Sequence, residues 1–330
     1  MTTPAQLAAE VNKVLGKDVL MMGNNSAFEM RYLPTGVLPF DVLTGGGFPR
    51  NRITELYGDW STMKSYVCLM AAANTLAAGG SVALIDTEHS YDSHWAAEMG
   101  VDTEALMVMH PATGEEAVDA SEALIRGGVD LLIWDSVAAT LPKDEAQKAS
   151  EDSFQPGRLA TLMSRSLRKL TTANSNTAMV YTNQVRMNIG VRFGNPETTP
   201  GGKSLPFFAS MRVNMRRTSK VTEDVSVAGK TAKLTVGMGI RASLEKSKVN
   251  RPHRDTEFIY DYRIPGVDEV DWLTRKGMEH GLVVKTGHKY SSPLDSTGKE
   301  CTYEKRWHTY LSENTKLMQL LVDAVLEIES

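Results

Sequence analysis

Residues 58–65 combine a glycine, a lysine and a serine at a spacing that binds phosphates. The segment starts at Gly58, ends in Lys64 and Ser65, and lies between a predicted strand (53–57) and a predicted helix (64–78). In such a loop, backbone N–H groups surround the phosphates, the lysine reaches the β- and γ-phosphates, and the serine hydroxyl binds Mg²⁺. The predicted nucleotide-binding run is Gly58, Asp59, Trp60, Ser61, Thr62, Met63, Lys64, Ser65 and Tyr66.

Met63 stands where the phosphate-loop pattern has its second glycine. A side chain at that position must avoid a positive φ or adopt it at an energetic cost. On this segment alone, a chance match without a phosphate role remains an alternative.

Two carboxylates follow predicted strands in the order that phosphate chemistry needs. Asp135 ends the apolar strand 130–135, where a carboxylate can hold the Mg²⁺ water shell. Glu88 follows the strand 81–86 and is the best-placed group to orient an attacking water. The alternatives are a helix-capping or turn role for Asp135 and a solvated loop position for Glu88.

These residues need a scaffold of alternating strands and helices, and the chain from residue 52 onward has that pattern. Strands are predicted at 53–57, 81–86, 130–135 and 177–183, and helices at 64–78, 114–126 and 156–173. Apolar strands without polar alternation, such as 82–85, are typical of a mostly parallel sheet that is covered on both faces. The predicted fold class is therefore α/β.

The flanking segments predict two smaller parts. Residues 4–15 predict an amphipathic helix ended by Gly16, and residues 18–22 a strand. Residues 212–262 predict strands and turns, and the chain closes with a helix over 313–327. We predict an N-terminal arm (1–27), a core (28–265) and a small α+β C-terminal domain (266–330).

Composition excludes several classes of protein. The 330 residues are 42% hydrophobic and 23% charged, which excludes disorder as a description of the whole chain. Two cysteines, Cys68 and Cys301, cannot form a disulfide framework or a cysteine zinc site. No apolar run reaches the roughly 18–20 residues of a membrane helix, and the first residues lack the pattern of a signal peptide. We expect a cytoplasmic protein without a membrane partner.

The net charge of −4 hides a strong segregation along the chain. Residues 153–220 contain 11 basic residues and one acidic residue, a formal charge of +10, so the remainder carries −14. Within this window, Arg158, Arg165 and Arg168 share a helix face, and residues 185–203 read as a mobile loop with basic and apolar side chains. Phosphate neutralisation with apolar insertion between bases is typical of sequence-independent single-strand binding. A solvated basic face is the alternative.

Taken together, these segments resemble the RecA-type DNA recombinases, and more specifically their phage branch, typified by UvsX. The matching segments are residues 53–58, 85–89, 134–139 and 183–187, and the most specific run is 194–199 with Gly201 and Gly202. A bulky residue at position 63 also resembles the phage branch. The resemblance implies a P-loop RecA-type core and ATP as the nucleotide.

The resemblance also implies roles for residues that spacing alone does not single out. Glu88 matches the catalytic glutamate, and Asp92 and Trp95 fall where the family reads and stacks the adenine. Gln184 matches the glutamine that senses the γ-phosphate and couples it to DNA binding.

Paired lysines at Lys246 and Lys248 match residues that reach into the ATP site of the neighbouring subunit. On the residues alone, a solvated strand face is the alternative. Pro206, Thr161 and Asn188 depart from bacterial RecA, and the first DNA loop, around residues 148–155, matches poorly. The implied DNA-binding set is Ser164, Arg168, Arg186, Asn188, Ile189, Arg192, Phe193, Gly201, Gly202 and Lys203.

The resemblance implies an ATP-dependent recombinase that forms helical filaments on single-stranded DNA and exchanges strands with homologous duplex DNA. ATP would be hydrolysed at subunit interfaces, in a bacterial or phage-infected cytoplasm, with single-strand-binding and loader proteins as candidate partners. Two alternatives share the core: a hexameric helicase-like motor, and a non-hydrolysing DNA-coating filament protein suggested by Met63.

Overall fold

The computed structural model describes residues 2–146, 157–187, 196–227, 230–264 and 266–329. The chain forms two units, Met1–Arg31 and Tyr32–Ser330. Each helix in the described ranges is too short or too polar to cross a bilayer.

The N-terminal unit contains α1 (Pro4–Leu15) and the short 3-10 helix η1 (Ser26–Phe28). Thr3 and Gln6 cap the start of α1 reciprocally, and Gly16 follows its end, as the sequence predicts. The strand predicted over residues 18–22 is absent from this described segment. The Asn12 side chain instead accepts hydrogen bonds from the N–H groups of Val19 and Leu20, which leaves no strand ladder there.

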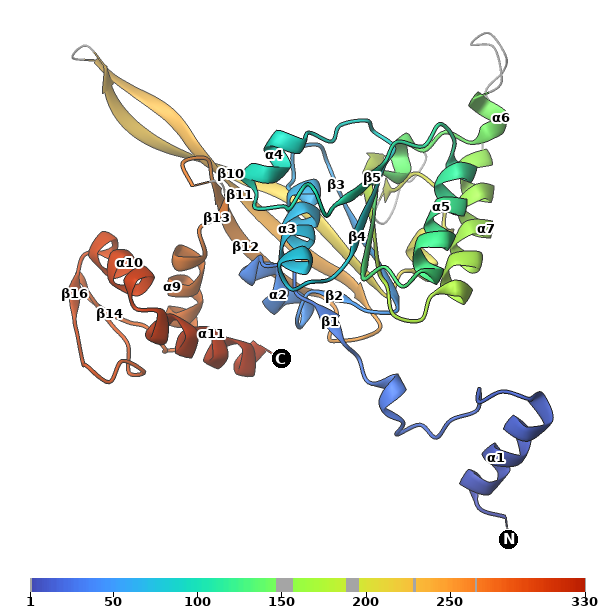
Figure 1. Cartoon of the computed structure of the whole chain (residues 1–330). Helices are drawn as coiled ribbons and strands as arrows, with labels where there is room; N and C mark the ends of the chain where they lie inside the picture. The colour runs from blue at the N-terminus through green and yellow to red at the C-terminus, as the bar shows by residue number, and fades with distance from the viewer. Residues whose placement is uncertain (1, 147–156, 188–195, 228–229, 265, 330) are drawn as a thin grey trace. The chain divides into compact units, whose positions relative to one another are not determined.

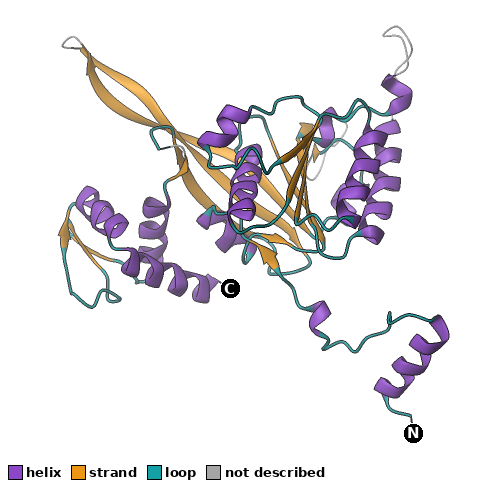
Figure 2. Cartoon of the chain, in the orientation of Figure 1, coloured by secondary structure: helices purple, strands orange, loops and turns teal. Residues whose placement is uncertain are grey.

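The second unit is built on a nine-stranded sheet (Figures 1 and 2). Its strand order is β13-β12-β11-β10-β3-β7-β6-β4-β5, and the six strands from β10 to β5 are parallel. This confirms the predicted mostly parallel α/β core. The strands are β3 (Arg52–Gly58), β4 (Val82–Asp86), β5 (Met107–Met109), β6 (Leu131–Asp135), β7 (Ala178–Gln184), β10 (Met211–Val227), β11 (Lys230–Ser247), β12 (Arg254–Asp261) and β13 (Gly266–Val267).

Helices cover both faces of the sheet, because side chains alternate between the faces along each buried strand. On β4, Val82 and Leu84 join one hydrophobic core, whereas Ala83 and Ile85 join the other. The first core is closed by α2 (Leu38–Thr44), α3 (Lys64–Ala77) and α4 (Ser93–Glu98), and the second by α5 (Gly114–Arg126), α7 (Arg158–Ala173) and α8 (Ser204–Phe208).

Short elements link these layers. They are β1 (Tyr32–Leu33), β2 (Phe48–Pro49), the 3-10 helix η2 (Val137–Ala139), α6 (Lys143–Ala146), β8 (Arg186–Met187) and β9 (Glu197–Thr198). The pair β8–β9 is antiparallel and closes the base of the predicted DNA loop.

Strands β10 and β11 form a ribbon that runs beyond the sheet (Figure 1). β10 pairs with β3 only over residues 211–215, and β11 pairs with β12 only over residues 237–244. Beyond these positions the two strands pair with each other, and residues 216–220 and 231–235 are exposed. The predicted strands between residues 212 and 262 are thus confirmed.

The C-terminal elements are α9 (Glu269–Glu279), β14 (Val284–Thr286), β15 (Lys289–Ser291), β16 (Cys301–Thr302), α10 (Glu304–Glu313) and α11 (Thr315–Glu329). The last helix corresponds to the predicted 313–327. Two buried indoles fix this part, since Trp272 donates to Thr256 Oγ1 and Trp307 donates to Thr274 Oγ1. The predicted division at residues 27 and 265 stays a prediction.

Candidate functional site

The phosphate-loop segment connects β3 to α3 and folds with two residues in the left-handed region. Ser61 has φ of 53° and Met63 has φ of 69°. Met63 therefore adopts the conformation that the missing glycine would take without strain. Gly58 must be glycine, because a Cβ there would lie 2.0 Å from the Met215 carbonyl oxygen of the neighbouring strand.

Lys64, the first residue of α3, folds its side chain back over the loop. Its Nζ donates to Asp59 O at 2.7 Å, Gly58 O at 3.2 Å and Thr62 Oγ1 at 3.3 Å. Burial lowers the pKa of Lys64, and Asp135 and Glu88 partly oppose that shift. A cation in this position can exchange carbonyl partners for phosphate oxygens.

Asp135, at the end of β6, joins the loop to the neighbouring strand. Its Oδ2 accepts from Ser65 Oγ at 2.7 Å, and its Oδ1 accepts from Thr182 Oγ1 at 2.5 Å. Burial raises the pKa of Asp135 despite these two hydrogen bonds. A hydroxyl beside a carboxylate is a set of hard oxygen donors, so Ser65 and Asp135 fit a water-shelled Mg²⁺.

A cavity of about 310 Å³ adjoins the loop and is lined by both residues predicted to hold the adenine, Asp92 and Trp95. Asp92 caps α4 by accepting from the N–H groups of His94 and Trp95, and these bonds lower the pKa of Asp92. Tyr260 on β12 also lines the cavity. The sequence offered no local signal for Tyr260, because it lies 165 positions after Trp95.

Glu88 sits between the ends of two strands. Its Oε1 accepts a 2.5 Å hydrogen bond from Ser136 Oγ and a 3.4 Å hydrogen bond from Gln184 Nε2. The structure therefore brings together Glu88 and Gln184, which the sequence singled out separately. Ser136, the residue after Asp135, was missed as a partner.

Asp86 shapes the turn that carries Glu88. The buried carboxylate accepts from the N–H groups of Glu88, Ser90 and Tyr91 at 2.9–3.1 Å. His110 Nδ1 lies 3.4 Å from the same carboxylate, and the His110 ring stacks on His89. Asp86 was not predicted, although three turn amides depend on it.

Trp60 belongs to the predicted nucleotide run but does not line the cavity beside the loop. Its side chain is 72% exposed, and the guanidinium carbon of Arg217 lies 4.2 Å from the ring centroid. Trp60 thus contacts Arg217, which belongs to residues 153–220, the basic window of the sequence.

Lys246 on β11 and Lys248, just after the end of β11, lie at the C-terminal end of α8. Lys246 Nζ donates to Pro206 O at 2.7 Å and to Phe207 O at 3.0 Å, and Lys248 Nζ donates to Phe207 O at 3.4 Å. Such cations stabilise the carbonyl end of a helix. Burial and the neighbouring Lys248 and Arg212 charges lower the pKa of Lys246.

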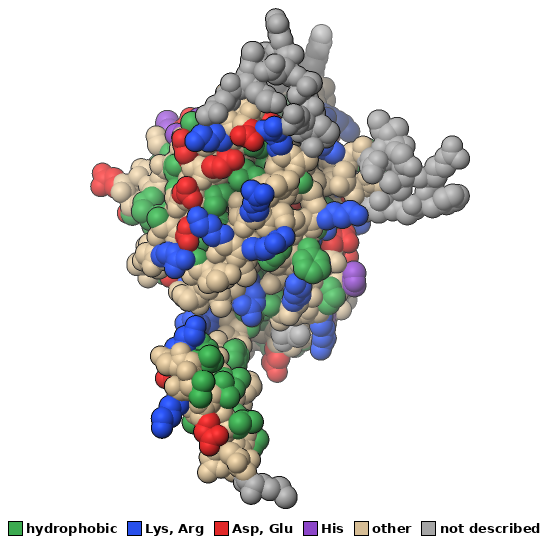
Figure 3. Space-filling model, turned by 90° about the vertical axis from the view of Figure 1, so that its right-hand side faces the viewer, with side chains coloured by type: hydrophobic (Ala, Val, Ile, Leu, Met, Phe, Trp, Pro, Cys, Tyr) green, Lys and Arg blue, Asp and Glu red, His purple; other side chains and the backbone are tan. Residues whose placement is uncertain are grey.

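The basic window is less positive in space than along the sequence. Among the described residues of this window, four cations pair with acids: Arg158 contacts Asp144, Lys169 contacts Asp119 and Glu122, Arg212 contacts Glu55, and Arg216 contacts Glu197. Figure 3 shows Lys and Arg side chains spread over the side of the core where α5 and α7 lie, with acidic side chains between them. The charge of +10 therefore overstates the field offered to a phosphate backbone.

Several predicted DNA-binding residues are exposed around the base of the loop. Arg168 donates to Ser164 Oγ on the surface of α7, and Arg186 and Lys203 are exposed on either side of the loop. Residues 148–155, Asn188, Ile189, Arg192 and Phe193 lie outside the described residues, as do the first two residues of the run 194–199.

Gly201 and Gly202 hold the returning end of the loop against the core. Both have positive φ, and a Cβ on either would lie within 2.8 Å of Val137 or Ala160 side-chain atoms. The two glycines are thus needed for close packing on η2 and α7.

A buried polar group ties the same loop end to the sheet. The fully buried Glu55 accepts from Arg212 at 2.6 Å and from Asn183 at 3.0 Å, and Asn183 also donates to Pro200 O at 3.1 Å. Neither Glu55 nor Asn183 was predicted as part of the site.

Comparisons with known proteins point to one family. The family model of the RecA N-terminal domain matches residues 5–264. A curated "Protein RecA" from Frankia casuarinae is 40% identical over 296 residues, covering 88% of this chain and 83% of the relative. Another from Nocardioides sp. is 40% identical over 324 residues, covering 97% and 89%.

A solved structure, the RadB recombinase, is similar in fold with a TM-score of 0.52 at 19% identity, over 71% of this chain and 98% of that one. The curated relatives are bacterial RecA proteins and give no support to the predicted phage branch. The chain belongs to the RecA family.

Proposed function

We propose that this chain is a DNA-dependent ATPase that acts as a homologous DNA recombinase. One observation carries the proposal: polar contacts run from the phosphate loop to the base of the DNA loop. They pass from Ser65 to Asp135, and from Ser136 through Glu88 to Gln184, the residue that ends β7.

In this proposal, the nucleotide lies between the loop and the cavity beside Trp95 and Asp92, with Ser65 and Asp135 holding Mg²⁺. ATP supplies the phosphoanhydride bond whose hydrolysis drives DNA release. Lys64 turns from its carbonyl partners to the phosphates, and the Glu88 carboxylate accepts a proton from the attacking water. Ser136 and Gln184 fix the orientation of that carboxylate.

Filament assembly would complete the site. Exposed apolar residues on α1, among them Leu7, Val14 and Leu15, offer a surface for a neighbouring copy in a head-to-tail arrangement. Lys246 and Lys248 would act in the nucleotide site of the adjacent subunit. Single-stranded DNA and homologous duplex DNA are the proposed substrates, in the bacterial cytoplasm.

The test is ATP turnover measured with and without single-stranded DNA, together with strand exchange between homologous substrates. We expect DNA to stimulate turnover, and Lys64→Ala to abolish ATP binding and exchange together. Exchange that survives in Lys64→Ala would overturn the nucleotide-site assignment. Unwinding of a forked duplex without a homologous partner would instead indicate a helicase-like motor.

A further inference from the structure

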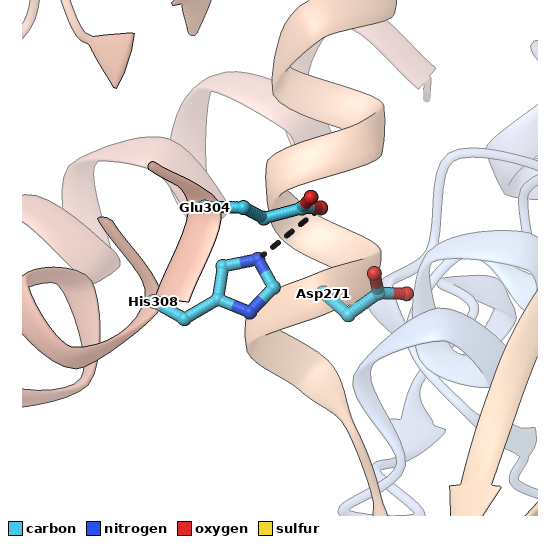
Figure 4. Close-up of side chains that lie close together, drawn as sticks. All are labelled: Asp271, Glu304 and His308. Atoms are coloured by element: carbon cyan, nitrogen blue, oxygen red, sulfur yellow. Dashed lines mark ion pairs between the residues drawn. The ribbon is translucent and has the colours of Figure 1, made fainter. Parts of the chain in front are cut away.

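Three potential metal ligands from two helices converge in the C-terminal part of the chain, away from the residues of the nucleotide site. Asp271 lies on α9, and Glu304 and His308 lie on α10 (Figure 4). One ligand atom from each side chain lies within 4.8 Å of the other two. Glu304 and His308 are four residues apart, so they project from the same face of α10.

His308 carries an unsatisfied nitrogen in this cluster. Its Nε2 is buried and has no hydrogen-bond partner among the described residues. The nearest carboxylate oxygen, Glu304 Oε1, is 4.0 Å away, which is too far for a hydrogen bond. A buried polar atom without a partner is uncommon in native proteins, so His308 Nε2 has room for a partner such as an ion or a water.

The two carboxylates differ in how they are held. Asp271 Oδ2 accepts from Arg275 Nε at 2.8 Å, which fixes the orientation of that carboxylate. Glu304 is 53% exposed and free to rotate toward the imidazole. Glu304 and His308 also line a groove of about 640 Å³, which gives an ion access from solvent.

We propose that Asp271, Glu304 and His308 bind a divalent transition metal, with Zn²⁺ as the best match. One imidazole nitrogen and two carboxylate oxygens suit Zn²⁺, whereas Mg²⁺ favours oxygen-only sites. Tetrahedral Zn²⁺ places its ligand atoms about 3.4 Å apart, so the three side chains, whose ligand atoms lie within 4.8 Å of one another, would draw together by about 1 Å on binding. The ion would join α9 to α10 and leave one position for water.

The experiment uses the full chain, stripped with a chelator and exchanged into buffer with excess Mg²⁺ to occupy oxygen-only sites. Calorimetric titration with ZnCl₂ should show one bound equivalent. Glu304→Gln and His308→Ala should each weaken Zn²⁺ binding by roughly tenfold or more, since even second-shell changes cost about 10–100-fold. His288→Ala, a histidine change in the same part of the chain, should bind Zn²⁺ as the native chain does.

Thermal unfolding gives a second readout that does not depend on ATPase activity. Zn²⁺ should raise the unfolding midpoint of the native chain and of His288→Ala, and leave Glu304→Gln unchanged. Because Glu304 is exposed, Glu304→Gln decides the test even where His308→Ala fails to fold. The proposal is overturned if the native chain binds no Zn²⁺, or if Glu304→Gln retains native affinity.

Discussion

Gln184 Nε2 donates a hydrogen bond to Glu88 Oε1 across 3.4 Å, and this contact joins the end of β7 to the turn after β4. The same Glu88 oxygen accepts the shorter bond from Ser136. Glu88 is therefore held by Ser136, just after β6, and by Gln184, the last residue of β7, from which the chain continues into β8.

Replacing Gln184 tests this coupling. Gln184→Ala should remove stimulation of ATP turnover by single-stranded DNA, with a loss of about tenfold or more, because positioned acid–base groups contribute roughly 10²–10⁴-fold. ATP binding, measured by fluorescent-nucleotide titration, should persist. Gln319→Ala, an exposed change on α11, serves as the control. A Gln184→Ala protein with full DNA stimulation would contradict the proposed path.

The positive φ of Met63 predicts an unusual order of stabilities. β-branched residues tolerate the left-handed region poorly, so Met63→Val should be less stable than Met63→Ala by about 1 kcal/mol, although valine is the larger apolar residue. Urea denaturation monitored by circular dichroism measures the difference in free energy of unfolding. A valine variant at least as stable as the alanine variant would show that the loop relaxes out of this conformation.

Lys246→Ala tests whether Lys246 acts in the nucleotide site of the adjacent subunit or only stabilises the end of α8. We expect nucleotide binding by the unassembled protein to stay unchanged and DNA-stimulated hydrolysis to fall by about tenfold or more. Lys316→Ala, a lysine change on α11, is the matched control. If Lys246 only holds the carbonyl groups of Pro206 and Phe207, hydrolysis per filament will stay at the native level.

The raised pKa of Asp41 predicts that the free energy of unfolding depends on pH. Its carboxylate accepts from Thr35 and Gly36, and burial raises the pKa of Asp41 to about 6 from 3.8. The folded state therefore binds this proton more tightly than the unfolded state. The stabilisation is complete below about pH 3.8 and is lost as the pH rises through 6.

Asp41→Asn should remove that dependence. Between pH 4 and 7, the native chain should lose on the order of 2 kcal/mol relative to Asp41→Asn, measured by urea denaturation at each pH. Parallel stability curves for the two proteins would exclude Asp41 as the source of this pH dependence.

Much of the fold could be predicted because pattern and boundary signals coincide. For α5, Thr113 caps the start, acidic residues fill the first turn, and the predicted 114–126 agrees with the observed Gly114–Arg126. The phosphate loop was equally accessible, since its lysine and serine lie within eight residues of Gly58. Apolar runs such as Leu131–Asp135 identified the buried strands.

What could not be predicted depends on contacts between distant parts of the chain. Glu55 neutralises Arg212 from 157 positions away, so a charge count along the sequence could not anticipate it. Asp271 and His308 meet only because α9 packs against α10. The strand predicted over 18–22 failed for a local reason, since one nearby side chain, Asn12, accepts hydrogen bonds from the backbone N–H groups of Val19 and Leu20.

Side chains alternate along β6, so neighbouring residues pack into different hydrophobic cores. Ile133 faces the core shared with α3 and lines the cavity beside Trp95, whereas Trp134 faces the core shared with α7 and stacks on Tyr181. A single strand thus contributes adjacent side chains to two separate cores, one on each face of the sheet. The buried indole of Trp134 is therefore placed to respond to changes in packing against α7 and Tyr181.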